Sequence, residues 1–93
     1  LFHFREGDGM KFNSKEFYNT LIKEEVDFYL RFANFDDRER TLFIFRNNKV
    51  PIERIAENMN CSVSTVNRIN KTMIRKIIKA SEFYYPGISK EWN

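Results

Sequence analysis

Apolar side chains recur at helical spacing along the first third of the chain. When residues 13–35 are placed at about 100° intervals around a helix axis, two adjoining apolar stripes appear. One stripe contains Phe17, Leu21, Phe28, Phe32 and Phe35, and the other contains Tyr18, Ile22, Val26, Tyr29 and Ala33. Asn13 is a suitable N-cap, and Glu16 three residues later completes a capping box. The pattern predicts one long helix over residues 13–34, after an N-terminal flank over residues 1–12.

The apolar arc of this helix is unusually wide. The two stripes together cover more than half of the helix surface, whereas a helix that faces a core on one side needs a narrower stripe. One interpretation is a homodimer formed through the second stripe, with Tyr18, Ile22, Val26 and Tyr29 at the interface. The alternatives are a helix wrapped by neighbours on two sides and a core helix with some exposed aromatic residues.

Three more helical segments follow, and each has a recognisable start. Asp36 or Asp37 can cap a helix that continues to about residue 46. Pro51 suits the first turn of a helix that continues to about residue 59. Ser62 can cap a last helix over residues 62–79, which runs on towards residue 83. No strand pattern competes with these segments.

The elements together predict an all-α fold. A chain of 93 residues fits one domain with a modest core. We expect that domain over residues 13–93, with the long N-terminal helix packed on a three-helix unit over residues 36–80. A C-terminal tail over residues 81–93 follows.

The last two segments have the spacing of a helix-turn-helix. Asn60 suits the turn, since asparagine tolerates the left-handed conformation at helix ends. Ala56 is small enough to let the two helices cross closely, so that Ile55, Met59, Val66 and Ile69 can share one core. The last helix then has one apolar face, made of Val66, Ile69, Met73, Ile77 and Ala80. The opposite face carries Ser64, Arg68, Lys71 and Arg75.

Charge is distributed unevenly along the chain. The net charge is only +3, but the segment from Asn60 to Ala80 contains no acidic residue. Its basic residues are Arg68, Lys71, Arg75, Lys76 and Lys79. A basic segment on an otherwise balanced domain indicates a polyanionic partner, and the alternative is a solvated helix face.

Part of the sequence resembles the DNA-binding domain of LuxR-type regulators. The resemblance covers roughly residues 35–80 and rests on Arg38-Glu39-Arg40, Leu42-Phe43, Ile55-Ala56-Glu57, Met59, Ser62, Thr65-Val66, Met73 and Lys76-Ile77. The segment is also similar to the promoter-reading final domain of bacterial sigma factors, with one residue fewer after Arg46. The loop glycine usual in LuxR-type domains is Lys49 here. The resemblance implies a helix-turn-helix regulator of bacterial or phage origin, with double-stranded DNA and RNA polymerase as partners.

These features predict sequence-specific binding of double-stranded DNA, with residues 62–79 in the major groove and transcriptional regulation as the outcome. Ser64, Asn67 and Arg68 lie in the first turns of the last helix, where side chains reach base edges. The candidates for contacts with the DNA backbone are Thr65, Lys71, Arg75, Lys76, Arg54 and Lys49.

The sequence has few features of other functional classes. One cysteine and one histidine cannot form an internal disulfide or a zinc site. Catalytic motifs and phosphate-binding glycine loops are absent, so we expect no enzyme activity, no metal and no cofactor. The sequence contains neither a signal peptide nor an apolar run long enough for a membrane span, and we expect a cytoplasmic protein.

Two other functions remain open from the sequence. A phage DNA-packaging protein similar to a small terminase subunit would also use a helix-turn-helix, within a ring-like oligomer. A protein-interaction adaptor would keep the fold without binding DNA. The size of the assembly and the salt dependence of DNA binding distinguish these functions.

Overall fold

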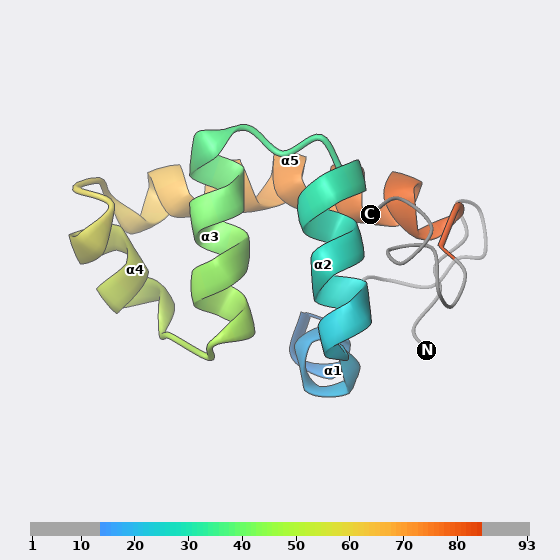
Figure 1. Cartoon of the computed structure of the whole chain (residues 1–93). Helices are drawn as coiled ribbons and strands as arrows, with labels where there is room; N and C mark the ends of the chain where they lie inside the picture. The colour runs from blue at the N-terminus through green and yellow to red at the C-terminus, as the bar shows by residue number, and fades with distance from the viewer. Residues whose placement is uncertain (1–13, 85–93) are drawn as a thin grey trace.

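The computed structural model describes residues 14–84, and all regular structure in this part of the chain is helical (Figure 1). The prediction of an all-α fold is confirmed. The five helices are α1 (Ser14–Thr20), α2 (Lys23–Phe32), α3 (Asp37–Asn47), α4 (Ile52–Asn58) and α5 (Val63–Ser81). The N-terminal flank, the Asn13 cap and the tail from residue 85 onward lie outside the described residues.

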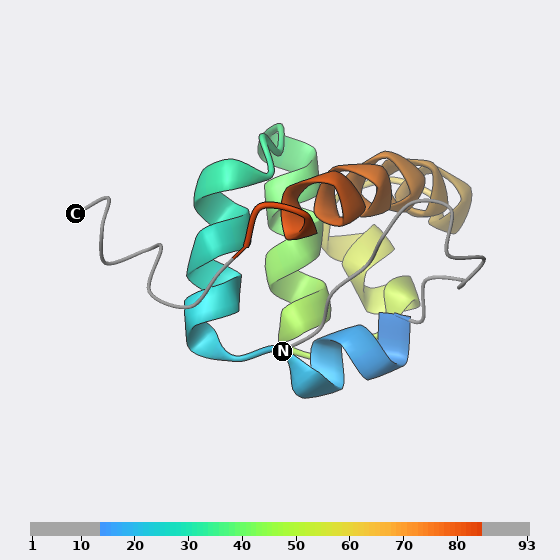
Figure 2. The same ribbon diagram turned by 90° about the vertical axis from the view of Figure 1, so that its right-hand side faces the viewer.

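The longest helix, α5, organises the others. It runs across behind α2 and α3, with α4 beside its N-terminal end (Figure 1). In the perpendicular view α2 and α3 stand side by side on one face of α5, and α1 lies below them (Figure 2). The buried face of α5 therefore supplies the central contact for α2, α3 and α4.

The single helix predicted over residues 13–34 was wrong, because the chain breaks between α1 and α2. Ile22 is extended, with φ −95° and ψ 163°, and its backbone N–H donates to Glu25 Oε1 at 3.1 Å. The Thr20 hydroxyl donates back to the carbonyl oxygens of Glu16 and Phe17, at 3.0 and 3.3 Å. These side-chain bonds replace helical backbone bonds at the break, as threonine and glutamate can do at helix ends.

The break also changes the role of the wide apolar arc. Tyr18 and Tyr29, two members of the stripe predicted to form a dimer, are 7% and 1% exposed and lie in the core of the chain. Val26 packs against that core, and only Ile22, at 47% exposure, faces outward. Because α1 and α2 approach the core separately, both stripes pack against it except at Ile22. The predicted dimer stripe is therefore mainly interior surface.

Aromatic rings join the two N-terminal helices to the rest of the domain. The ring of Tyr29 on α2 contacts those of Phe17 on α1 and Phe43 on α3, with centroid distances of 5.6 and 6.0 Å. Phe28 contacts Tyr84, just after α5, at 5.0 Å. Such edge-to-face pairs contribute about 0.5–1.5 kcal/mol each beyond the burial of their area. They fix α1 and α2 against the same framework that positions α4 and α5.

Candidate nucleic-acid interface

The turn between α4 and α5 has a defined hydrogen-bond pattern. Asn60 adopts the left-handed conformation, with φ 58°, as the sequence predicted. Its N–H donates to the Glu57 carbonyl oxygen at 3.2 Å, and the Cys61 N–H donates to that of Ala56 at 3.0 Å. This pair of bonds is a Schellman motif, which satisfies the last carbonyl groups of α4 and reverses the chain within a few residues.

The helices on either side of the turn pack closely. Ala56 is buried at the crossing, and Ile55, Val66 and Ile69 are buried around it, as expected for a shared helix-turn-helix core. Met59 packs against the same cluster. The small side chain of Ala56 keeps the two backbones near each other, so the opposite face of α5 is turned away from the protein.

Ser62 starts α5 as predicted. Its Oγ accepts a hydrogen bond from the Thr65 backbone N–H at 3.1 Å, which satisfies one of the free N–H groups of the first turn. The hydroxyl groups of Ser62 and Thr65 also lie 3.1 Å apart and share a hydrogen bond. Thr65, predicted to contact the DNA backbone, is therefore half-buried and already has an intramolecular partner.

The outward face of α5 contains all three residues predicted to read bases. Ser64, Asn67 and Arg68 are exposed in its first two turns, and so are Lys71 and Arg75 further along. The opposite face, made of Val66, Ile69, Met73, Ile77 and Ala80, is buried as predicted. At 1.5 Å per residue, the exposed stripe from Ser64 to Lys79 is about 22 Å long.

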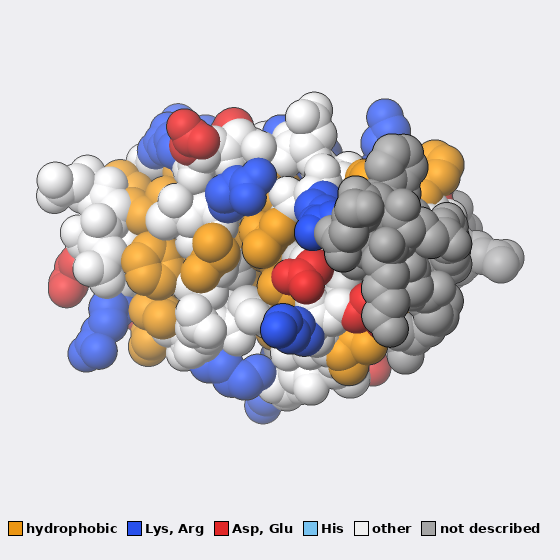
Figure 3. Space-filling model, in the orientation of Figure 1, with side chains coloured by type: hydrophobic (Ala, Val, Ile, Leu, Met, Phe, Trp, Pro, Cys, Tyr) orange, Lys and Arg blue, Asp and Glu red, His pale blue; other side chains and the backbone are white. Residues whose placement is uncertain are grey.

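The electrostatic character of this stripe differs from that of the face made by α2, α3 and α4. Arg68, Lys71, Arg75 and Lys79 are exposed on α5, and no acidic residue occurs from Val63 to Ser81. On the face shown in Figure 3, where α2, α3 and α4 lie in front of α5, lysine and arginine side chains are interspersed with acidic and apolar ones. A charge of one sign along one helix gives a directed attraction for an anion.

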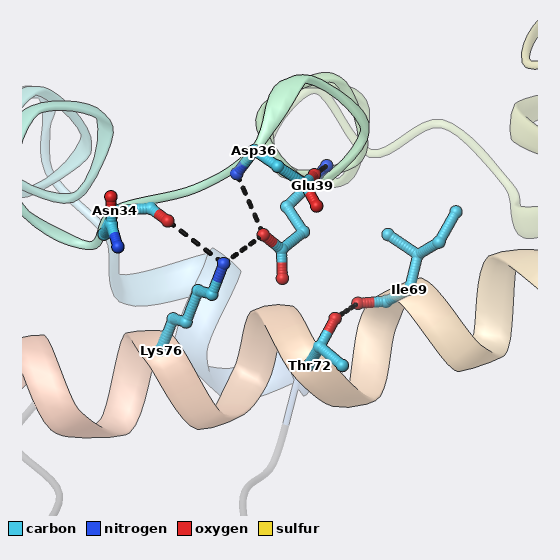
Figure 4. Close-up of polar contacts among 6 residues, drawn as sticks. All are labelled: Asn34, Asp36, Glu39, Ile69, Thr72 and Lys76. Carbon is cyan, nitrogen blue, oxygen red and sulfur yellow. Dashed lines mark hydrogen bonds and ion pairs between the residues drawn. The ribbon is translucent and has the colours of Figure 1, made fainter.

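Lys76 does not belong to the exposed stripe, contrary to the prediction of a contact with the DNA backbone. Its Nζ donates to Glu39 Oε1 on α3 at 2.6 Å and to the Asn34 carbonyl oxygen at 3.0 Å (Figure 4). Glu39 is 1% exposed. The ion pair is therefore an internal link that holds the middle of α5 against α3.

Glu39 is fixed from its own helix as well. Asp36 caps α3, as one of the two predicted candidates, and exchanges hydrogen bonds with Glu39 at 2.8 and 2.9 Å. Burial by itself would raise the pKa of Glu39, but the Asp36 N–H and the Lys76 ammonium stabilise its charged form and hold that pKa below its usual value. Glu39 is a buried carboxylate that serves as an anchor.

The remaining predicted phosphate contacts lie away from the stripe. Arg54 is exposed on α4. Lys49, in the corner between α3 and α4, is left-handed with φ 64°, and its Nζ donates to Asn19 Oδ1 on α1 at 2.8 Å. The structure therefore directs Lys49 towards α1, a contact that no sequence spacing indicated because the partners are 30 positions apart.

Residues 14–84 contain neither a metal-binding cluster nor a membrane-spanning helix. No group of three or more histidine, cysteine or acidic residues in this part of the chain could hold a metal ion. None of the described helices combines the length and apolar character needed to cross a membrane. Comparison with known proteins gives no family model, curated protein or solved structure that matches the chain.

Proposed function

We propose that this protein binds double-stranded DNA with sequence preference and acts in transcriptional regulation. The observation that carries the proposal is the combination of a helix-turn-helix corner with an exposed, acid-free outer face on its second helix. A helix of this kind fits the major groove, where its N-terminal side chains meet base edges. The resemblance to LuxR-type and sigma-factor domains agrees with this function.

The proposed reading residues are those nearest the start of α5. Asn67 is suited to paired hydrogen bonds with adenine, and Arg68 to paired hydrogen bonds with guanine. Ser64, one turn earlier, can donate to or accept from either kind of base. All three are exposed, so no conformational change of the core is needed to present them.

Residues further along α5 would contact phosphates. Lys71, Arg75 and Lys79 continue the exposed stripe towards the C-terminal end of the helix. Phosphate contacts fix the register of a protein on DNA but carry no direct sequence information. The Lys76–Glu39 ion pair supports this arrangement because it limits the motion of α5 relative to α3.

One recognition helix buries too little surface for tight and selective binding, so we expect two half-sites or a larger assembly. Since Tyr18 and Tyr29 lie in the core, the second protein surface would have to lie elsewhere. RNA polymerase remains the partner that the sigma-factor resemblance suggests.

The first experiment is selection of bound duplexes from a random-sequence pool, combined with affinity measurements across a salt series. A steep salt dependence with an enriched motif would support the proposal, and a palindrome would indicate paired half-sites. Salt dependence without a motif would favour the packaging function. If no duplex bound at low salt, the DNA function would be excluded and the adaptor would take its place.

A matched pair of variants tests the reading residues. Arg68→Ala should weaken binding of the selected site by about 1–3 kcal/mol and relax preference at one base pair. Arg31→Ala removes an equal charge from an exposed position on α2 and should leave the motif and its affinity nearly unchanged. Equal weakening of all sequences by Arg68→Ala would make Arg68 a phosphate contact instead.

A further inference from the structure

A hollow of about 200 Å³ lies where α1 meets the corner between α3 and α4. The described residues that line it are Lys15, Tyr18, Asn19, Arg46, Lys49, Val50 and Pro51. We propose that this hollow is a binding site for a phosphate group, separate from the outer face of α5. The proposal stands independently of DNA binding, because none of the lining residues belongs to α5.

Three cations from different elements converge on the hollow. Lys15 comes from α1, Arg46 from the last turn of α3, and Lys49 from the corner that follows. None of the described lining residues is acidic, and none of the three cations forms an ion pair with a carboxylate in the described part of the chain. Clustered like charges repel one another, so an anion between them would be stabilising.

Lys49 is held in place at this site at a conformational cost. A lysine in the left-handed conformation is less stable than a glycine would be there. Its ammonium nevertheless reaches across to Asn19, with a 2.8 Å hydrogen bond. Strained backbone at a non-glycine residue occurs often at ligand sites, where the side chain at that position is needed.

Tyr18 provides a second, independent observation at this site. Its residue is more than nine-tenths buried beside the hollow, and its hydroxyl oxygen is buried without a hydrogen-bond partner. Burial raises the pKa of Tyr18, and the nearby charge of Arg46 only partly opposes this rise, so the phenol stays protonated. A small shift of the ring would let the hydroxyl donate to an anion in the hollow.

The donors of the site match a phosphate group, and the hollow has room for one. The volume is below the roughly 300 Å³ at which pockets for larger organic ligands begin. Guanidinium groups bind phosphate oxygens in pairs, while lysine acts as a mobile point charge. The phosphate could belong to a small molecule or to the backbone of bound DNA, and the chemistry of recognition is the same for both.

The test is thermal unfolding of the whole chain in increasing inorganic phosphate, with chloride added to keep the ionic strength constant. Binding to the folded state should raise the melting temperature along a saturating curve. Lys15→Gln and Lys49→Gln should each weaken the apparent phosphate affinity by about tenfold. Lys71→Gln on the exposed face of α5 is the control and should leave it unchanged. If phosphate did not raise the melting temperature of the parent chain, the proposal would be overturned. It would also be overturned if the apparent phosphate affinity were the same in Lys15→Gln, Lys49→Gln and Lys71→Gln.

Tyr18→Phe gives a signature that a merely structural role would not produce. Without phosphate this variant should melt at a higher temperature than the parent chain, because it removes a buried, unpaired hydroxyl. With phosphate its additional stabilisation should be smaller than that of the parent chain. If phosphate raised the melting temperature of Tyr18→Phe as much as that of the parent chain, Tyr18 would not belong to the site. If the lysine variants also responded as the parent chain does, the site itself would be overturned.

Binding of a selected DNA duplex then identifies the source of the phosphate. If Lys15→Gln weakens the duplex and inorganic phosphate together, the hollow takes a phosphate of the DNA backbone. If it weakens only inorganic phosphate, the ligand is a small phosphate compound. A chain that binds no duplex but keeps the saturable phosphate response would refute the proposed DNA function and leave this site standing.

Discussion

The two corners on either side of α4 share one backbone design but differ in the residues that fill it. At each corner a left-handed residue closes a Schellman motif, Lys49 with φ 64° after α3 and Asn60 with φ 58° after α4. Asparagine adopts this conformation readily, whereas lysine does so at a cost. The carbonyl of the outer bond belongs to Phe45 at the first corner and to Ala56 at the second.

This difference indicates what each corner contributes to the molecule. The second corner combines a favourable turn residue with a small side chain, so it brings α4 and α5 close together with little strain. The first corner carries a larger aromatic residue and a strained lysine that reaches to α1. The second corner thus supplies a close, unstrained turn, while the first places a charge at a position where glycine would stabilise the fold more.

The largest effect should come from the ion pair that fixes the direction of α5 after the second corner. Lys76→Met removes the cation from the buried Glu39 carboxylate; because the Lys76 side chain is 35% exposed and the Asp36 N–H still donates to Glu39, we expect a loss of about 2–3 kcal/mol in the free energy of unfolding. Urea unfolding measures it. Lys79→Met, on the same helix but exposed, is the control and should change stability by less than about 0.5 kcal/mol. Similar small losses in both variants would contradict the role of the pair.

The same pair should make the fold sensitive to acid. Because the pKa of Glu39 is lowered in the folded state, its contribution is complete above its usual value near 4.5 and is lost as the pH falls through the lower folded value. Urea midpoints from pH 7 to pH 3 should therefore fall less steeply in Glu39→Gln than in the parent chain. Asp37→Asn removes an exposed carboxylate on the same helix and should keep the parent slope.

A direct test of the second corner is to enlarge its small residue. Ala56→Leu should destabilise the fold by about 1–3 kcal/mol, because the added atoms have no space at the crossing of α4 and α5. Phe45→Leu at the matching position of the first corner reduces a half-buried side chain and should cost less. Urea unfolding measures both losses. If Phe45→Leu lost more stability than Ala56→Leu, the second corner would not be the tightly packed one.

The smallest effect separates the two left-handed residues. Lys49→Gly should raise the free energy of unfolding by about 0.5–1 kcal/mol, since relief of strain exceeds the extra entropy of the unfolded chain. Asn60→Gly should change it by only a few tenths, because asparagine already tolerates this conformation. Urea midpoints of the two variants, measured side by side, compare the two changes. If both variants gained the same stability, Lys49 would be no more strained than Asn60.

The sequence predicted the C-terminal half of the fold better than the N-terminal half. The limits of α4 and α5 are set by residues with well-known preferences for helix ends. Pro51 precedes α4, Asn60 forms the turn after it, and Ser62 caps α5. The break before α2 has Ile22 at its N-cap, and isoleucine is among the least favoured residues there. The only local signals were Thr20 and Glu25, whose bonds to the backbone are recognisable once the break is known.

Within the candidate site, the sequence predicted which residues of α5 are exposed but not which of them bind other helices. Helical periodicity placed Ser64, Asn67 and Arg68 on the exposed face, because exposure on one helix follows from spacing alone. The same periodicity places Lys76 about 100° away from Arg75 and beside the apolar face, but it could not identify the partner of Lys76. Lys76 has its partners 37 and 42 positions earlier in the chain, and such pairings depend on how the helices pack.

The attachment of Lys76 has a mechanical consequence for α5. Lys76 lies five positions before Ser81, the last residue of α5, so its ion pair fixes the C-terminal half of the helix against α3. Arg68 lies roughly 12 Å from Lys76 along the helix axis. The buried face between them packs on α3 and α4, so α5 is held along its length and not at a single point. A partner that docks on the exposed stripe would therefore meet a preorganised surface, and little of its binding free energy would be spent on ordering α5.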